Sequence, residues 1–538
     1  MKLTIKNFFL ITSFAFAIQG CKEEKEYLNP YSGGKAPLGV AFNGQVAPKP
    51  TEGDVNALVE FAVSGLDKYP RNEISFTFNG VQGEILDVTA NTVKVKVPAN
   101  ASTGLVNLQV QDQIFVGPKF SVLGKIDFDI NLQETRGTNG SIYDCLPVSD
   151  NRLLLVGGFS KYANRTQMNG LVRVRQDGFV DDTFRPNGGA GGSIFSILAT
   201  GGKMFVAGSL GAYRYNPGGV STMSNIFGIT RLQEDGSLDS TFANTYNNRK
   251  IAVASFSGGT NTAISKIYSN DNKIVAVGGF RWYIKPIYNR PSSPYQVGNQ
   301  TVRFDTLFID SVEIPQVLRF DQNGNLDKTY RFDASKNRGF SAGNGSVVAS
   351  YMHIDGKLLL AGNFTKFDDV VAERIIRLKA DGTIDPSFSA KANRYITSVS
   401  FDEATQKYLV SGIFTTFNGE PASGLVRLNA DGSTDKSFAA KSFASGYPDF
   451  AKRLSNGLIL VSGNFESYGG IRRYHIMFLT PSGELAQGYN ALGDLKGYVE
   501  KVVEETDVQG RMVLTLLGSF NELNGTYVNN LARIVLKP

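Results

Sequence analysis

The chain is poor in the residues that build metal sites and disulfides. Its 538 residues include two cysteines, two histidines and one tryptophan. Two histidines in different parts of the chain give no spacing typical of a zinc site. Cys145 lies in an apolar, strand-like segment, which favours a small core residue over a disulfide partner. We therefore predict no metal, no cofactor and no disulfide.

Strong charge and catalytic motifs are also missing. The formal net charge of +6 is mild for this length, and no basic stripe with interleaved aromatic residues indicates a nucleic-acid partner. No Gly-x-Ser-x-Gly elbow or Ser/His/Asp arrangement marks a nucleophile, so we assign no catalytic residues and predict a protein that is not an enzyme. Aspartates are plentiful, which leaves a paired-carboxylate hydrolase or lyase open as an alternative.

Long apolar runs are missing beyond the N-terminus. Residues 1–21 combine Lys2 and Lys6 with an apolar core at 8–18, the pattern of a secretory signal. This core is too short to span a bilayer as a helix. The end of the segment, Ile-Gln-Gly-Cys21, resembles a lipobox, which implies that Cys21 is lipidated and anchors the protein. An ordinary cleaved signal is the alternative.

The residues after Cys21 suggest a localisation signal and a flexible linker. Lys22, Glu23 and Glu24 resemble the signal that exports bacteroidete lipoproteins to the outer face of the outer membrane. That resemblance implies a lipid-anchored protein facing the cell exterior, whereas the alternative is a solvated charged tether. Residues 22–36 contain proline, serine and glycine and predict a flexible linker.

Residues 37–122 predict a small β-sandwich. Apolar and polar residues alternate at 59–63, 74–78 and 93–97, and a further strand is expected at 104–110. Alternation over short runs is typical of half-buried strands. The order of these strands, with Pro98 closing the third, resembles the immunoglobulin-like IPT/TIG domains. The resemblance implies a spacer or docking module.

Glycine is abundant, and it marks a repeat. The stretch 357–388 contains an apolar run, a glycine, a second apolar run, an Asp-Gly turn and a closing Ile-Asp-x-x-Phe. Units of about 50 residues with four short strands predict a β-propeller, and 124–538 would hold seven blades. Two intervals between copies are longer, which we attribute to an insertion in the third blade. The glycine that ends the first apolar run recurs at Gly157, Gly208, Gly278, Gly362, Gly412, Gly463 and Gly518.

A second pattern fixes the register of each repeat. An arginine stands five residues before the turn glycine and an aspartate three residues after it; in a three-residue hairpin these positions face each other. The sixth copy replaces both, with Phe478 and Ala486, which supports a cross-strand ion pair. A metal or anion site is the alternative. The predicted structural pairs are Arg173–Asp181, Arg231–Asp239, Arg319–Asp327, Arg377–Asp385 and Arg427–Asp435.

The seventh copy lacks its last strand, because the chain reaches Arg533 and ends soon afterwards. Residues 124–130 carry the missing pattern, with a glycine at 124 and Asp127 three residues later. We predict that this segment closes the seventh blade and that Asp127 pairs with Arg533. A ring closed by a strand from its own beginning leaves no open sheet edge.

The repeat pattern is similar to a known family. Gly-x-Phe followed by Arg-Leu-x-x-Asp-Gly-x-Leu-Asp-x-Ser-Phe resembles the delta-60 repeat of bacterial surface proteins, also called the DUF5122 propeller. The resemblance covers about 137–538. It departs from the pattern at Ser209 and Leu210 in the second copy.

The connections between strands predict where a ligand or partner binds. The longest, 281–316, falls between the second and third strands of the third blade. Aromatic faces stack on sugar rings or grip peptide side chains; packing of the loop on itself or on a neighbouring lipoprotein is the alternative. An aromatic residue that recurs three positions after the phenylalanine of Gly-x-Phe favours packing within each blade. The predicted binding residues are Trp282, Tyr283, Tyr288, Arg290, Tyr295, Arg303, Tyr213 and Tyr215.

These resemblances together imply a non-enzymatic outer-membrane surface lipoprotein. It would bind a glycan or peptide, or dock on a Sus-like TonB-dependent nutrient importer. A surface hydrolase or lyase using carboxylates of the propeller face is one alternative, and a structural scaffold or adhesin is another.

Overall fold

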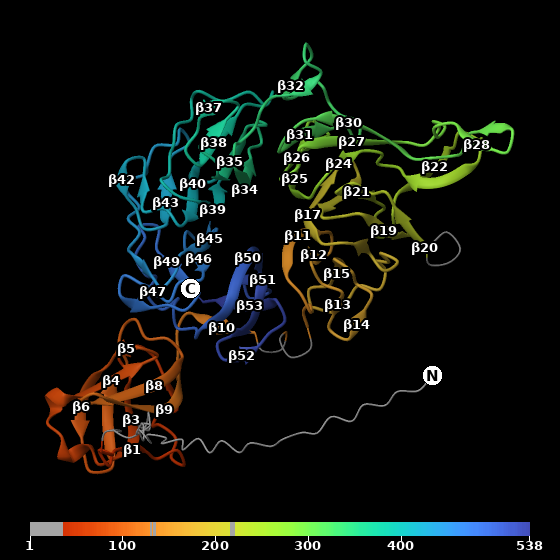
Figure 1. The fold of residues 1–538 in the computed structure, drawn as a ribbon. Helices are drawn as coiled ribbons and strands as arrows, with labels where there is room; N and C mark the ends of the chain where they lie inside the picture. Colours follow the sequence, from red (N-terminus) through yellow and green to blue (C-terminus); the bar gives the residue numbers. More distant parts are fainter. Residues whose placement is uncertain (1–35, 130–131, 133–135, 216–220, 538) are drawn as a thin grey trace, which may run out of the picture.

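The computed structural model describes residues 36–129, 132, 136–215 and 221–537. These residues fold almost entirely into β-strands, and no α-helix occurs among them. Two short 3-10 turns lie at Leu66–Lys68 and Arg71–Glu73. The predictions made for residues 1–35, which include Cys21 and nearly all of the tether, lie outside the described residues. The predicted all-β class is confirmed (Figure 1).

The N-terminal unit consists of two sheets that share one apolar core. In β4, Ile74, Phe76 and Phe78 are buried while the residues between them are half-exposed. The four predicted strands are present, and the immunoglobulin-like assignment stays a prediction. One sheet contains β1 (Ala41–Phe42), β3 (Leu58–Ser64), β7 (Thr92–Lys96) and β6 (Glu84–Val88); the other contains β2 (Glu52–Gly53), β9 (Gln113–Val122), β8 (Gly104–Val110), β4 (Ile74–Phe78) and β5 (Val81–Gln82).

Seven antiparallel sheets built on one plan follow in the rest of the described chain, and we call each a blade. Their first strands surround the centre of a ring (Figure 1). The first blade contains β11 (Ile142–Val148), β12 (Arg152–Gly157) and β15 (Leu171–Val174), the second β17 (Ile194–Thr200), β18 (Lys203–Gly208) and β21 (Ile229–Leu232), and the third β25 (Ile264–Asn270), β26 (Lys273–Gly278) and β31 (Val317–Phe320). The fourth contains β34 (Ser346–Met352), β35 (Leu358–Asn363) and β38 (Ile375–Leu378), and the fifth β39 (Ile396–Asp402), β40 (Lys407–Gly412) and β43 (Leu425–Leu428). The sixth contains β45 (Pro448–Arg453), β46 (Ile459–Gly463) and β49 (Ile476–Leu479), and the seventh β50 (Leu495–Thr506), β51 (Met512–Leu523) and β53 (Leu531–Leu536).

The second strand of each blade explains why the sheets form a ring. In the first six blades these strands are short and largely apolar, and at most two residues of each are not buried. A strand buried on both faces needs a neighbouring sheet on each side. Apolar side chains of neighbouring blades pack together between the sheets. Leu155 of the first blade, for example, packs in one core with Leu517 and Leu531 of the seventh. Burial between blades therefore continues across the junction of the first and seventh blades.

The last blade is completed by a strand from before the first blade, as predicted. Strand β10 (Ile126–Phe128) pairs antiparallel with β53. The predicted partner of Arg533 is wrong, because Asp127 lies opposite Val535 and Asp129 takes the place facing Arg533. No hairpin turn joins these two strands, so nothing local fixes their register, and a shift of two residues keeps the same side chains on each face.

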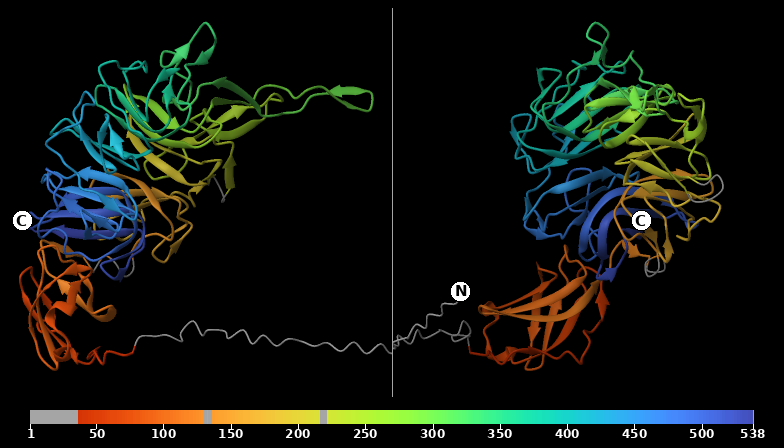
Figure 2. Two further views of the ribbon diagram at one scale, coloured as in Figure 1. Left: turned by 60° about the vertical axis from the view of Figure 1, so that its left-hand side comes forward. Right: turned by 45° about the vertical axis from the view of Figure 1, so that its right-hand side comes forward.

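The N-terminal unit contacts the sixth and seventh blades. The side-chain amide of Asn79 donates to Asp494 Oδ1 at 3.2 Å, and Arg472 Nε donates to Asn79 Oδ1 at 3.1 Å. Arg473 Nη2 donates to the carbonyl of Asn100 at 2.9 Å. Ala491 lies in the apolar core of the N-terminal unit. Figure 2 shows the unit beside these blades in both views.

Candidate binding surface

The arginine and aspartate of each predicted hairpin are paired. In five blades the arginine Nε lies 2.7 Å from the aspartate Oδ2, and both side chains are nearly buried. In the sixth blade Phe478 and Ala486 are buried in an apolar cluster instead. The five ion pairs predicted within hairpins are therefore confirmed. Because the pairs are built into the blades, they are not free to hold a metal or an anion.

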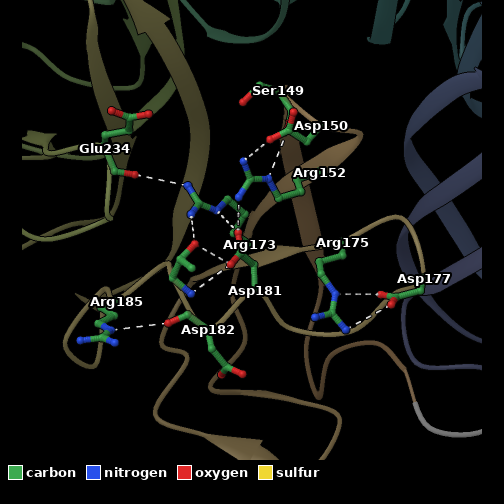
Figure 3. Close-up of polar contacts among 11 residues, drawn as sticks. Ser149, Asp150, Arg152, Arg173, Arg175, Asp177, Asp181, Asp182, Arg185 and Glu234 are labelled. Atoms are coloured by element: carbon green, nitrogen blue, oxygen red, sulfur yellow. Dashed lines mark hydrogen bonds and ion pairs between the residues drawn. The ribbon is translucent and has the colours of Figure 1, made fainter.

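Further contacts explain the rest of the repeated motif. Asp181 lies beside Arg173 (Figure 3). Thr183, two residues after Asp181, donates its main-chain N–H and its hydroxyl to Asp181 Oδ1 at 3.0 and 2.6 Å. The guanidinium carbon of Arg173 lies 4.9 Å from the centre of the Phe184 ring, a cation–π contact. Ser387 and Phe388 contact Asp385 and Arg377 in the same way. The sequence Asp-x-Ser/Thr-Phe is thus a packing motif.

The carboxylate of Asp385 is held in the charged form. Burial alone would raise the pKa of Asp385, but hydrogen bonds from Ser387 and Arg377 lower it below its usual value. The same arginines also reach the next blade. Arg231 Nη1 donates to the carbonyl of Gln322 at 2.7 Å, and Arg427 Nη1 to that of Pro481 at 2.6 Å. Each acceptor stands two residues before the turn glycine of the following blade.

The recurring aromatic residue also has a structural partner. Its hydroxyl donates to the carbonyl of the turn glycine within the blade, and where the residue is phenylalanine another side chain donates instead. The donors are Tyr162 to Gly178 (2.7 Å), Tyr213 to Gly236 (2.8 Å), Tyr283 to Gly324 (3.0 Å), Arg331 to Gly382 (2.8 Å), Asn418 to Gly432 (3.0 Å) and Tyr468 to Gly483 (2.6 Å).

This finding corrects two predicted binding residues. Tyr213 and Tyr283 are buried, and their hydroxyl groups are used inside their own blades, so neither faces a ligand. Burial raises the pKa of Tyr283 to about 12. Tyr215 ends β19 (Ala212–Tyr215), and its side chain lies outside the described residues.

The long insertion of the third blade is an additional sheet with a projecting hairpin. Strands β24 (Gly259–Thr260), β27 (Trp282–Ile287) and β30 (Phe308–Glu313) form the sheet. Between β27 and β30, strands β28 (Tyr295–Val297) and β29 (Gln300–Val302) form a hairpin that extends far from the ring (Figure 2). The insertion was predicted as a loop, whereas half of its residues are in strands.

A second hairpin accompanies the first. Strands β22 (Ser240–Asn244) and β23 (Lys250–Ala254) precede the third blade. Their turn contacts the insertion, because the Asn247 amide donates to Asp305 Oδ1 at 2.8 Å. One long interval between repeats therefore comes from this hairpin and not from an insertion within the third blade. We call residues 240–254 and 288–307 the arm.

The remaining predicted binding residues lie on or beside the arm. Trp282, at the first residue of β27, is 36% exposed, and Tyr295 at the hairpin is 62% exposed. Arg290 and Arg303 are exposed, while Tyr288 is half-buried. Four of these five residues therefore belong to the arm, whereas Trp282 lies at the start of β27, before the arm.

Other arm residues escaped the sequence analysis. Phe304 is 51% exposed and its ring centre lies 6.3 Å from that of Tyr295. Phe242 on β22 is 69% exposed. Phe304 lies within the predicted loop, so its aromatic character was the available signal. Phe242 is the phenylalanine of the Asp-x-Ser/Thr-Phe motif in the second blade, so the sequence indicated a residue that packs within its blade and not an exposed one.

Residue types that bind metals are scattered. Within the ranges that the structure describes, no three His, Cys, Asp or Glu side chains gather as a metal site. His353 Nε2 and the Tyr408 hydroxyl are 2.5 Å apart. Cys145 is buried and free, and burial raises its pKa to about 12. None of the helices in the described residues is long and apolar enough to cross a membrane.

Comparison with protein families agrees with the repeats. The family described as "Domain of unknown function (DUF5122) beta-propeller" matches residues 149–184, 355–388 and 407–438. These three matches lie in the first, fourth and fifth blades. A second family, "Domain of unknown function (DUF5008)", matches residues 20–118, which include most of the N-terminal unit. A search of curated proteins found no significant match.

Solved structures resemble the chain weakly. The WD40 β-propeller domain of Doa1 is 11% identical over 75% of this chain and 95% of its own, with a TM-score of 0.38. An auxiliary nutrient binding protein from Bacteroides ovatus is 10% identical over 92% and 99%, with a TM-score of 0.26. One from Bacteroides thetaiotaomicron is 11% identical over 92% and 99%, with a TM-score of 0.22. Similarity at this level does not decide function.

Proposed function

We propose that this protein is a non-enzymatic, lipid-anchored protein of the cell surface that captures a nutrient, either a glycan or a peptide, or docks on a Sus-like importer through its arm. The main observation behind this proposal is the projecting arm. It extends beyond the ring, and the blades close and pack without it.

The surface chemistry of the arm supports recognition. Tyr295, Phe304 and Phe242 expose more than half of their surface. Clustered exposed apolar groups are typical of interaction sites in soluble proteins. Aromatic rings bury much area at little conformational cost, and the exposed Arg290 and Arg303 supply donors that orient a polar ligand.

The proposed lipid anchor and the proposed export to the cell exterior are inferred from the sequence. Cys21 with Lys22, Glu23 and Glu24 motivates the lipid anchor and the export to the exterior. We expect Cys21→Ser to release the protein from the membrane. Replacing Lys22–Glu24 with alanine should leave it anchored but protected from external protease. Unchanged surface labelling of the second variant would contradict the export signal.

The binding function can be tested through the single tryptophan. Trp282 lies where the insertion begins, so ligand binding near it should change its fluorescence with no second tryptophan to confuse the signal. Glycan and peptide panels would be titrated into wild type and into Tyr295→Ala. Tyr527→Ala is the matched control, since Tyr527 is 67% exposed on the seventh blade.

We expect Tyr295→Ala to weaken binding by about 1–3 kcal/mol, the scale of an aromatic anchor, and Tyr527→Ala to bind as wild type does. If both variants bind equally well, the ligand does not contact the arm. If no panel member binds and the arm variants keep every membrane partner, the proposed function is wrong.

A further inference from the structure

A β-bulge recurs at the same place in the innermost strand of every blade. Near its start, each first strand skips one residue in its pairing with the second strand. A bulge redirects the side chain of the extra residue and is common beside binding sites. In ring order the seven skipped residues are Tyr143, Phe195, Ser265, Val348, Thr397, Asp449 and Glu500.

All seven of these residues line one cavity. Its volume is about 700 Å³, within the range of roughly 300–1,000 Å³ that small-molecule sites occupy. Because its walls come from the first strands of all seven blades, the cavity lies at the centre of the ring (Figure 1). One bulge residue from each blade thus contributes to a shared site.

The ring of bulge residues is chemically uneven. Asp449 and Glu500 stand in the adjacent sixth and seventh blades. The next two blades in the ring contribute Tyr143 and Phe195, whose ring centres lie 5.3 Å apart edge to face. The other three positions hold small or apolar residues. A pair of carboxylates therefore borders a pair of aromatic rings.

The neighbouring lysines do not neutralise these two carboxylates. Lys266 and Lys501 both bind the buried Asp144, with Nζ–O distances of 2.6 and 2.9 Å. Among the described residues, neither Asp449 nor Glu500 has a side-chain hydrogen bond or ion pair. Both lysines thus bind Asp144, and, in the part of the chain that the structure describes, Asp449 and Glu500 face the cavity without a basic partner.

The environment disfavours the charged form of both groups. Burial raises the pKa of Asp449 to about 6. Burial, together with the charge of Asp449, raises the pKa of Glu500 to about 7. A ligand that brings positive charge between them would offset both effects, because an opposite charge stabilises a carboxylate.

We propose that the central cavity binds a small organic cation, with its ammonium group held by Asp449 and Glu500 and its apolar body against Tyr143 and Phe195. Ammonium groups bind both to carboxylates and to aromatic faces. A calcium ion takes six to eight oxygen ligands, whereas two carboxylates and two aromatic rings suit an organic ligand. This inference does not depend on the proposed function of the arm.

Calorimetric titration of the full chain with 2-phenylethylamine tests this proposal, and 2-phenylethanol is the neutral analogue. Glu500→Gln and Asp449→Asn keep the shapes of the side chains and remove the charges. Asp271→Asn is the control, because Asp271 is exposed in a hairpin turn. We expect each cavity variant to weaken amine binding at least tenfold and the control to leave it unchanged, with the alcohol binding at least tenfold more weakly than the amine.

Titration at pH 6.5 in buffers of different ionisation enthalpy should show protons released on binding. The other titratable groups near the carboxylates are Asp144, Lys266, Lys501, Tyr143, Tyr395, Tyr447 and Tyr498. The proposal is overturned if wild type does not bind the amine at millimolar concentration, if the alcohol binds equally, or if the cavity variants bind as wild type does. Binding of Ca²⁺ that the same variants abolish, without amine binding, would make this a metal site instead.

Discussion

The guanidinium of Arg533 in the last strand donates a hydrogen bond to the main-chain carbonyl of Gln176 in the first blade, 357 residues earlier, at 2.7 Å. Arg231 and Arg427 make the equivalent contact to the blade that follows each of them. Arg533 repeats this contact across the junction of the ring. Strand β10 and this arginine therefore join the two ends of the propeller.

Loss of Arg533 should weaken the closed ring. Its side chain is largely buried, and Arg533→Leu leaves the Gln176 carbonyl without its donor. We expect the free energy of unfolding to fall by about 1–3 kcal/mol in urea denaturation. Arg175→Leu is the control, because Arg175 pairs with Asp177 where both side chains are about half exposed, and it should cost less than about 1 kcal/mol. Equal losses would contradict a special role for the junction.

The pair Arg377–Asp385 should be energetically coupled. Both side chains are less than a tenth exposed, so removing one leaves a buried, unpaired charge. A double-mutant cycle on Arg377→Leu and Asp385→Leu should give an interaction energy of about 0.5–3 kcal/mol. The exposed pair Lys436–Glu420 at 3.4 Å should give almost none. Additive effects at Arg377 and Asp385 would contradict the structural role of the pair.

Strand β10 should stabilise the propeller through its buried apolar side chain. Ile126 is 7% exposed and packs in the core of the sixth and seventh blades. Ile126→Ala should lower the free energy of unfolding by about 2–5 kcal/mol. Ile114→Ala removes the same atoms from a residue that is 66% exposed and should change stability by less than about 0.5 kcal/mol. Similar denaturation midpoints for the two variants would show that β10 does not close the blade.

The cavity carboxylates should make stability fall as pH rises. The pKa of Glu500 is raised to about 7 in the folded chain, above the usual 4.5, so between these values the folded state holds more protons than the unfolded state. Its contribution to stability therefore declines from pH 5 to pH 8. Asp385 acts in the opposite direction, because its lowered pKa makes stability decline only in acid.

Glu500→Gln removes the first effect. We expect the variant to gain stability relative to wild type between pH 5 and pH 8, as measured by urea denaturation at both values. A difference between variant and wild type that stays constant over this range would show that Glu500 does not titrate as described.

Sequence reasoning succeeded where a short turn fixes geometry. The turn glycine of each repeat, such as Gly382 with φ of +84°, sets the hairpin register and places Arg377 opposite Asp385. Strict alternation likewise located β4 and β7, because each has one buried face.

Sequence reasoning failed where distant segments meet. Arg533 faces Asp129 and not Asp127 because no turn joins their strands. Tyr213 and Tyr283 looked like ligand contacts, yet each donates to a turn carbonyl that only the folded blade brings near. Asp449 and Glu500 were not distinguished from other acidic residues, because a bulge that shifts one side chain into the cavity leaves no periodic signal.

The most direct test of the proposed function is cross-linking and co-purification of the protein from intact membranes, comparing wild type with the double variant Tyr295→Ala/Phe304→Ala. Tyr527→Ala again serves as the matched control. We predict that wild type and the control retain the same importer component or bound glycan or peptide, and that the double variant loses it while keeping its melting temperature. Retention of every partner by the double variant would contradict recognition through the arm.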